Sequence, residues 1–492
     1  MSHIMAIDQG TSSSRVIIFD AQGRPLAAVQ HEFDMAFPAD GWVEQDPEVL
    51  WRTSLLAGRD ALDRAGLQGK DVAAIGITNQ RETTLVWDRN TGDCLHPAIV
   101  WQDRRTAGRC AAMSAEGMQE TVASTTGLVI DPYFSGTKLA WLLESLPEAR
   151  RLASRGGLCF GTVDSYLIWR LTKGGTHVTD ATNASRTMLY DINRQAWSEP
   201  MLEYFGVPSA ILPEVRDSAG SFGVADPEWF GASIPILGVA GDQQAALIGQ
   251  ACFDEGMVKS TYGTGCFLMT NTGTSPVRSR HKLLTTVAYR LGGQATYALE
   301  GSIFSAGVAV KWLRDQLGLV TEAHETEAAA RRTGGDTRGV YLVPAFTGLG
   351  APYWDPNARG LFTGMTLDTN RDHLITATLA SVAYQTVALI EAVAADGAEV
   401  GQLRVDGGMV VNDWLCQFLA DIIGCPVERP VNVETTALGA ALLAALGGGL
   451  VDDLASAGRM WGLDREFLPA MPDTQREYLL TGWHKAVERV LA

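Results

Sequence analysis

The amino-acid sequence predicts an α/β protein made of two domains of similar size. Short apolar stretches alternate with amphipathic ones, which is typical of this class, although an α+β protein with large mixed sheets would give the same alternation. The 492 residues are more than one core usually holds. Two hairpin-like segments also recur about half a chain apart. We therefore expect domains spanning residues 1–249 and 250–492.

The first predicted helix begins at Asp46-Pro47-Glu48 and continues through Leu50, Leu55 and Leu62. Asp is a favoured N-cap, and Pro is favoured at the first helical position because its missing N–H has no helical partner to lose there. The apolar run Ile75-Gly-Ile-Thr78 follows and predicts a strand. Helix and strand thus alternate in the way that the predicted class requires.

Two hairpins carry the internal similarity. The segments Met5–Phe19 and Met257–Met269 both predict a strand, a polar glycine turn and a second strand. Gly10 and Gly263, at the two tips, are 253 positions apart (263 − 10). A duplicated domain with one hairpin in each copy would give this spacing. Chance would give it too, because turns favour both Gly and Thr.

The composition argues against nucleic acids and membranes as partners. The net charge is −17, and no block rich in Lys and Arg offsets it, so polyanions would be repelled. The 7 cysteines are scattered and lack the spacing of a zinc site, which is typical of reduced thiols in a cytoplasmic protein. No secretion signal and no run of about 18 apolar residues is found. We expect a cytoplasmic protein without a membrane span.

The tip of the first hairpin is a candidate phosphate site. Gly10 is followed by hydroxyl-bearing residues and an arginine, namely Thr11, Ser12, Ser13, Ser14 and Arg15. Backbone N–H groups in such a turn can form an anion-binding nest, whereas the Walker and GxGxxG patterns are absent. A solvated hairpin is the alternative for this turn alone. Asp8, just before the tip, favours phosphate binding because its carboxylate could hold a Mg²⁺ ion beside the phosphates.

Two further glycine-rich elements could complete a nucleotide site. The second hairpin tip, Tyr262-Gly-Thr-Gly265, offers another set of donors, with Thr264 as the best hydroxyl. The segment Val405–Asn412 contains the pair Gly407-Gly408 after a strand, so a nucleotide could approach its backbone closely. A tight strand-to-helix turn is the alternative for this last segment.

The stretch Pro235–Leu247, PILGVAGDQQAAL, ends an apolar run in a single aspartate followed by two amides. At the end of a strand, the carboxylate of Asp242 could act as a general base, with Gly241 leaving the approach open. Gln243 is neutral, so it could hold a second hydroxyl without adding charge. An ordinary helix N-cap is the alternative for Asp242.

Arg81 and Glu82 are suited to binding a polyol. The guanidinium donates and the carboxylate accepts, so the pair could hold adjacent hydroxyls in one orientation. Tyr133 adds a further hydroxyl at a turn shaped by Pro132. A surface ion pair after a strand is the alternative for Arg81 and Glu82.

Taken together, these segments resemble the FGGY carbohydrate kinases, which have the fold of sugar kinases, Hsp70 and actin-like ATPases. Within that family the chain is most similar to the glycerol kinases. The resemblance covers essentially the whole chain, and it is carried by Asp8–Arg15, Thr78–Thr84 (TNQRETT), Trp101–Arg104 (WQDR), Asp131–Lys138, Gly241–Ala246, Ser260–Phe267, Gly348–Pro356 and Val405–Gly408.

The resemblance implies two actin-like, ribonuclease H-like domains around a central cleft for ATP and substrate. It implies transfer of the γ-phosphoryl group of Mg²⁺-ATP to glycerol, giving sn-glycerol 3-phosphate, with Asp242 as general base. By the same resemblance, the glycerol-binding residues are Arg81, Glu82, Trp101, Tyr133, Asp242, Gln243 and Phe267, with Trp101 and Phe267 as a wall along the carbon chain. Ordinary core aromatics are the alternative for Trp101 and Phe267.

For the nucleotide, the resemblance implies contacts from Thr11, Ser12, Ser13, Arg15, Thr264, Gly307, Lys311, Gly408 and Asn412, with Mg²⁺ at Asp8. Lys311 departs from the family pattern, in which an amide is common. Family members also suggest a homodimer or homotetramer.

Two features of regulated relatives are missing from the sequence. Trp229–Pro235 contains no lysine, unlike the loop of relatives inhibited by fructose 1,6-bisphosphate, and no histidine lies between His177 and His281, where some bacterial relatives are phosphorylated. We therefore expect neither form of control.

Two other functions fit parts of the same pattern. One is an FGGY kinase for another polyol or a ketopentose, against which the set Arg81, Glu82 and Trp101 favours a triol. The other is an ATPase switch of the actin or Hsp70 kind. A switch would need a partner-binding domain or polymer surface, and the sequence shows no such addition.

Overall fold

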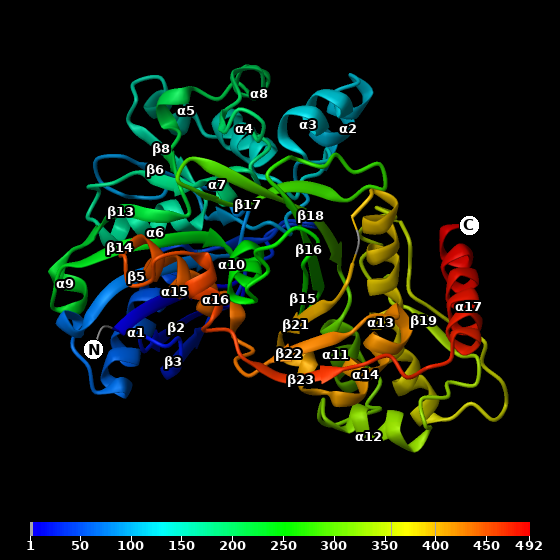
Figure 1. The fold of residues 1–492 in the computed structure, drawn as a ribbon. Helices are drawn as coiled ribbons and strands as arrows, with labels where there is room; N and C mark the ends of the chain where they lie inside the picture. The colour runs from blue at the N-terminus through cyan, green and yellow to red at the C-terminus, as the bar shows by residue number, and fades with distance from the viewer. Residues whose placement is uncertain (1–2, 356, 399) are drawn as a thin grey trace.

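The computed structural model describes residues 3–355, 357–398 and 400–492, and two mixed sheets lie at its centre (Figure 1). The predicted α/β class is confirmed. Pro356, the last residue of one stretch quoted above, lies outside the described residues.

The first sheet has six strands, in the order β13-β14-β5-β1-β2-β3. Strands β1, β2 and β3 are antiparallel neighbours, and β5 and β14 continue from β1 as parallel neighbours. The strands span His3–Gln9 (β1), Ser13–Phe19 (β2), Pro25–Glu32 (β3), Val72–Asn79 (β5), Ala219–Ala225 (β13) and Ile234–Gly241 (β14).

The second sheet has seven strands, in the order β17-β18-β16-β15-β21-β22-β23. They span Val258–Tyr262 (β15), Cys266–Gly273 (β16), Leu284–Leu291 (β17), Gln294–Ile303 (β18), Leu403–Asp406 (β21), Val427–Pro430 (β22) and Leu463–Phe467 (β23). Only the β15–β21 and β21–β22 pairs are parallel.

The two sheets share a five-strand topology. Three antiparallel strands followed by two parallel ones give β3-β2-β1-β5-β14 in the first sheet and β18-β16-β15-β21-β22 in the second. Both predicted hairpins, β1–β2 and β15–β16, are confirmed and occupy the same place in their sheets. The tips at Gly10 and Gly263 are therefore equivalent in topology, as a duplication would give.

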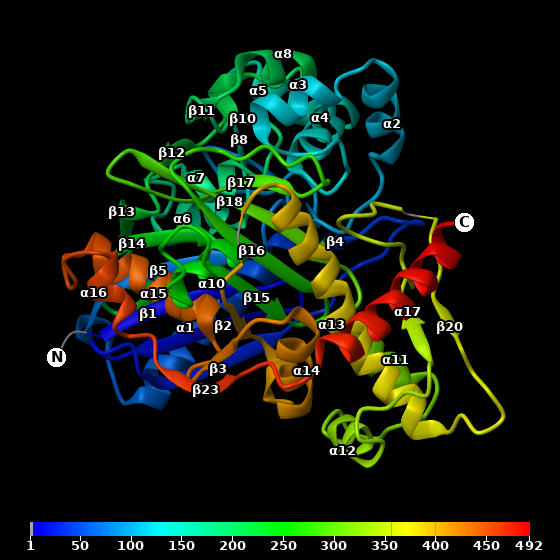
Figure 2. The ribbon, with the colours of Figure 1, turned by 45° about the vertical axis from the view of Figure 1, so that its right-hand side comes forward.

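Helices α10 (Asp242–Gly249) and α15 (Thr435–Gly447) follow equivalent strands and cross each other closely. Figures 1 and 2 show them side by side, and α10 contacts strands of both sheets. The crossing depends on glycine: a Cβ on Gly439 would lie 1.8 Å from the Ala245 carbonyl oxygen, and one on Gly249 would lie 1.9 Å from that of Thr435. Segments from both halves of the chain thus meet beside Asp242.

Helix α1 (Pro47–Ala65) covers β2 and β3 of the first sheet. Its predicted start is confirmed, because the Asp46 side chain accepts a hydrogen bond from the N–H of Glu48 (2.9 Å).

The segment between β5 and β13 forms the upper part of the molecule in Figure 1. Its longer helices are α2 (Ala107–Ala115), α3 (Gln119–Thr126), α4 (Ser135–Ser145), α5 (Pro147–Ala153), α6 (Val163–Leu171) and α8 (Glu199–Phe205).

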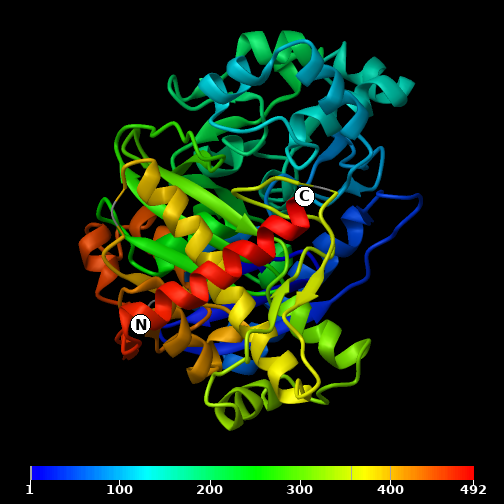
Figure 3. The same ribbon diagram turned by 90° about the vertical axis from the view of Figure 1, so that its right-hand side faces the viewer.

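Helix α13 (Arg371–Ala395) lies in the core beside the second sheet, and Figure 3 shows it together with the C-terminal helix α17 (Asp473–Leu491). Tyr384 of α13 stacks on Trp483 of α17, with ring centroids 5.3 Å apart. Helix α13 is long and apolar enough to cross a membrane, but 89% of its most apolar stretch is buried within the protein, as in a core helix. Around it lie α11 (Gly307–Asp315), α12 (Glu325–Arg332) and α14 (Asp413–Ile423).

Candidate functional site

The tip of the first hairpin is held by residues of neighbouring segments. Gly10 N–H donates to the Ser13 carbonyl oxygen (2.9 Å) and closes the turn. Gln80 Nε2 donates to the Gly10 carbonyl oxygen (3.1 Å), and Trp101 Nε1 donates to Thr11 Oγ1 (2.9 Å). Segments predicted to bind the polyol therefore contact and position the predicted phosphate tip.

The tip of the second hairpin packs against the start of α11. The N–H groups of Gly307 and Val308 donate to the carbonyl oxygens of Gly263 (3.0 Å) and Thr264 (3.1 Å). A Cβ on Gly307 would lie 2.5 Å from the Gly263 carbonyl oxygen, so only glycine fits without a shift. The structure thus brings Thr264 and Gly307 together, and their contact with a nucleotide stays a prediction.

Asp242 and Arg81 meet where β14 passes into α10. Arg81 Nε lies 3.1 Å from Asp242 Oδ1, and the Asp242 side chain remains 32% exposed. Asp242 is the first residue of the helix, and Gly241 is its N-cap. A Cβ on Gly241 would lie 2.7 Å from Cγ and Cδ of Arg81. The glycine before the aspartate therefore makes room for the Arg81 side chain.

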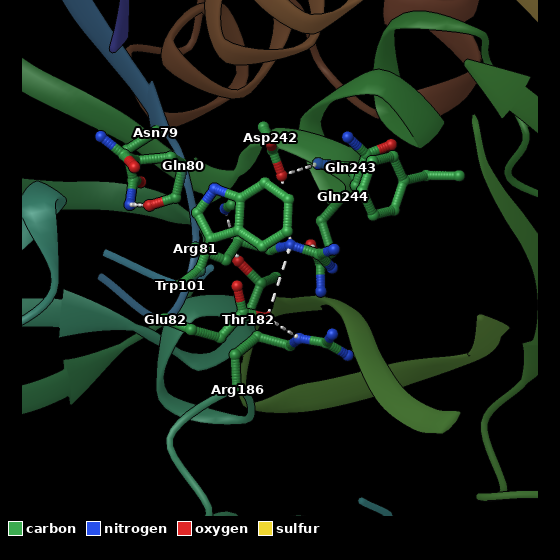
Figure 4. A network of polar contacts seen from close by, with 12 residues as sticks. Asn79, Gln80, Arg81, Glu82, Trp101, Thr182, Arg186, Asp242, Gln243 and Gln244 are labelled. Carbon is green, nitrogen blue, oxygen red and sulfur yellow. Dashed lines mark hydrogen bonds and ion pairs between the residues drawn. The ribbon is translucent and has the colours of Figure 1, made fainter. Parts of the chain in front are cut away.

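A chain of alternating charges leads away from Asp242 into the protein. Arg81 donates through both terminal nitrogens to Glu300 of β18, with Nη2 3.0 Å from Oε1. Arg186 Nη2 donates to the same Glu300 (3.0 Å), and Arg186 Nε donates to Glu82 Oε1 (2.6 Å). Figure 4 shows this network around Arg81, Glu82 and Arg186. Arg81 and Glu82 are both buried, so a surface ion pair is not what they form.

Burial and ion pairing act in opposite directions on the two glutamates. Burial alone would raise the pKa of Glu300, but Arg186 and Arg81 outweigh it and lower the pKa to about 2. For Glu82, burial prevails over Arg186 and Arg81 and raises the pKa. Glu82 also has a positive φ of 60°, a conformation that costs energy for a residue with a side chain. Such strain often accompanies a functional site.

Three aromatic residues gather beside this network. The ring of Trp101 lies edge-on to Tyr133, with centroids 5.5 Å apart, and to Phe267 of the second sheet, at 6.5 Å. Figure 4 shows Trp101 among Arg81, Asp242 and Gln243. Trp101 and Phe267, which we call the aromatic wall, therefore come from different halves of the chain.

Asp8 and Arg15 flank the first hairpin tip. Burial raises the pKa of Asp8 to about 7, with Arg15 opposing this and Asp242 and Glu434 adding to it. Arg15 is ion-paired with Glu434, and its Nε donates to Gln30 Oε1 (3.0 Å), so a phosphate would have to compete for it.

A Mg²⁺ ion fits these residues only as a partner of bound phosphates. Asp8 and Asp242 offer hard carboxylate oxygens, which Mg²⁺ prefers. In the part of the chain that the structure describes, no group of three or more His, Cys, Asp or Glu residues could hold a metal. Phosphate and water oxygens would have to supply the remaining ligands.

Family models for the FGGY family of carbohydrate kinases match residues 3–249 with the N-terminal domain and residues 258–447 with the C-terminal domain. The chain belongs to the FGGY carbohydrate kinases. It is 60% identical over 491 residues to glycerol kinase 1 of Pseudomonas aeruginosa (100% of this chain, 99% of the relative). It is 58% identical to the glycerol kinase of Rhodospirillum centenum, over 99% of this chain and 97% of the relative.

Solved structures agree with this membership. Glycerol kinase of Plasmodium falciparum, crystallised with ADP, matches with a TM-score of 0.92 and 37% identity, over 100% of this chain and 99% of that one. Xylulose kinase of Lactobacillus acidophilus matches with a TM-score of 0.88 over 99% and 97% of the two chains, but at 20% identity it shows the fold alone.

In this FGGY kinase, the residues expected near the rest of the nucleotide lie along the second sheet. Gly408 begins a short 3-10 turn that ends at Val411, and Asn412 is the N-cap of α14. Asn412 Oδ1 accepts from the N–H of Leu415 (3.0 Å), so the amide oxygen already has a structural partner. Lys311 lies exposed on α11.

Four polar residues form hydrogen bonds with predicted site residues of this FGGY kinase and were missed by reasoning from the sequence. They are Arg186, Gln244, Lys259 and Glu300. Gln244 Oε1 accepts from Arg81 Nη1 (3.2 Å), and Gln243 Oε1 accepts from Lys259 Nζ (2.5 Å). One signal was present: Lys259 and Glu300 are each the only charged residue of their strand, and a charged residue inside a buried strand is rare unless it has a partner.

Proposed function

We propose that this FGGY kinase transfers the γ-phosphoryl group of ATP to a terminal hydroxyl of glycerol, giving sn-glycerol 3-phosphate and ADP. The names of its relatives support glycerol as the acceptor. The observation that carries the proposal is the place of Asp242, partly exposed at the end of β14 and next to Arg81 and the aromatic wall.

In the proposed reaction Asp242 is the general base. Its carboxylate accepts the proton of the terminal hydroxyl while the hydroxyl oxygen bonds to the γ-phosphorus, and the bond from that phosphorus to the ADP oxygen breaks. Arg81, Glu82, Tyr133 and Gln243 would hold the hydroxyls of glycerol. The rings of Trp101 and Phe267 would lie along its carbon chain and leave little room for larger sugars.

The two hairpin tips would hold the phosphates in a cleft between the two sheets. Thr11, Ser12, Ser13 and Arg15 would contact them from one side, and Thr264 and Gly307 from the other. Lys311, Gly408 and Asn412 would lie nearer the α-phosphate and adenosine. A Mg²⁺ ion at Asp8 would supply positive charge that offsets the charge of the transferred group.

The proposal extends to the organisation of the chain. We place the boundary between glycerol-binding and ATP-binding domains near residue 250, which the positions of the two sheets support. A cytoplasmic location, expected from the scattered cysteines, remains part of the proposal. So does a homodimer or homotetramer, which the family resemblance implies.

A coupled assay of ADP release tests the acceptor. The panel contains glycerol, dihydroxyacetone, xylulose, ribulose, erythritol, gluconate and a reaction without acceptor. We expect fast turnover with glycerol and little with the larger sugars. Faster turnover of another polyol or ketopentose would replace glycerol as substrate, and ADP release without an acceptor would support an ATPase switch.

A further inference from the structure

Lys259, in β15 of the second sheet, places a fully buried ammonium group against Gln243. Its Nζ donates to Gln243 Oε1 (2.5 Å), to Thr261 Oγ1 (3.1 Å) and to the Phe267 carbonyl oxygen (3.3 Å). All three acceptors are neutral. Across residues 3–355, 357–398 and 400–492, no carboxylate forms an ion pair with this ammonium group.

Burying an ammonium group without an ion-pair partner is costly. Burial lowers the pKa of Lys259, against the opposing effects of Asp406, Asp242 and Glu300. A methionine or leucine would fill the same space without this cost. The charge therefore calls for a functional reason, and the contact to Gln243 supplies one.

The contact fixes which end of the Gln243 amide is free. Lysine has only donors, whereas the glutamine amide has an acceptor oxygen on one side and a donor NH₂ group on the other. Lys259 must therefore take the oxygen, which turns Nε2 the other way. Gln243 follows Asp242 directly, so the free NH₂ group belongs to the residue next to the proposed base.

We propose that Lys259 is a positioning residue that holds the Gln243 amide. In this orientation the NH₂ group of Gln243 donates a hydrogen bond to an oxygen of the bound substrate, which accepts the phosphoryl group. This rests on the proposed function, in which Gln243 contacts glycerol. It makes the side chain of residue 243 a hydrogen-bond donor toward the substrate that accepts the phosphoryl group. It also ties substrate binding to β15, the strand that leads directly into the second phosphate tip at Tyr262-Gly-Thr-Gly265.

A double-mutant cycle tests this role. Lys259→Met removes the donor and keeps a side chain of similar length, Gln243→Ala removes the amide, and the third variant combines them. Thr261→Val is the matched control, because it removes another acceptor of Lys259 and leaves Gln243 intact. KM and kcat are measured for the acceptor that the wild-type enzyme turns over fastest, so a wrong substrate assignment does not affect the cycle.

We expect Lys259→Met to raise the acceptor KM about tenfold, as loss of one well-placed hydrogen bond would, with KM for ATP changing less than about twofold. In the Gln243→Ala background the same substitution should change the acceptor KM less than about twofold. Thr261→Val should leave the acceptor KM near the wild-type value.

If Lys259→Met and Gln243→Ala each raise the acceptor KM and the two factors multiply in the double variant, the proposal is overturned. So would a normal acceptor KM with a large loss of kcat, which would assign the ammonium group to the transferred phosphoryl group instead. If Lys259→Met does not fold, Lys259→Leu replaces it in the same cycle, with circular dichroism and the thermal midpoint as checks of folding.

Discussion

Glu300 of the second sheet accepts hydrogen bonds from both terminal nitrogens of Arg81, which follows β5 of the first sheet. The remaining nitrogen, Nε, faces Asp242 at 3.1 Å. Glu300 therefore fixes the plane of the guanidinium, and the orientation of Arg81 toward the proposed base depends on a residue more than 200 positions away (300 − 81 = 219).

The first prediction concerns this contact. Glu300→Gln should raise the glycerol KM about tenfold or more, because Arg81 and Arg186 lose a charged acceptor and the plane of the Arg81 guanidinium is no longer fixed. Steady-state kinetics with glycerol and ATP varied separately would measure it. Asp164→Asn is the control, since Asp164 is equally buried but its partners are Thr162 and Thr179. Similar kinetic losses in both variants would mean that any buried carboxyl matters equally.

The second prediction concerns stability and pH. The folded protein lowers the pKa of Glu300 from 4.5 to about 2, so its contribution to the free energy of unfolding is complete above pH 4.5 and is lost as pH falls toward 2. That contribution is on the order of 3 kcal/mol. In urea titrations, the gap in unfolding free energy between wild type and Glu300→Gln should shrink as pH falls below 4.5. A gap that is the same at pH 7 and pH 3.5 would contradict the assigned charge state.

The third prediction concerns Gly241. A methyl group there would lie 2.7 Å from Cγ and Cδ of Arg81, so Gly241→Ala should displace the Arg81 side chain. The glycerol KM should rise in Gly241→Ala and also in Arg81→Ala, with KM for ATP little changed in both. Gly231→Ala is a useful comparison, because a Cβ there meets nothing within 4 Å, although its positive φ adds some strain. An unchanged glycerol KM in Gly241→Ala would show that Arg81 adapts or does not hold the substrate.

The sequence was sufficient to predict features that depend only on residues close together in the chain. The hairpins at Gly10 and Gly263 follow from a polar glycine turn between two apolar strands, and α1 follows from Asp46 and Pro47. Asp242 stood out because a carboxylate at the end of an apolar run is conspicuous.

Residues that act across the fold were harder to predict. Glu300 and Lys259 reach Arg81 and Gln243 only because two sheets from different halves of the chain lie together, and no local pattern encodes that approach. The burial of Arg81 and Glu82 was likewise invisible in an Arg-Glu dipeptide, which more often lies at the surface. Arg186, the partner of Glu82, comes from the loop after α7 (Ala181–Ala184).

The most direct test of the account is the turnover of Asp242→Asn with glycerol. Asparagine keeps the size of the side chain but cannot accept the proton, so kcat should fall by about 10²–10⁴-fold, while glycerol and ATP still bind within a few-fold of wild-type affinity in calorimetry. A kcat within about threefold of wild type, with binding intact, would remove Asp242 from the role of general base and contradict the proposed mechanism.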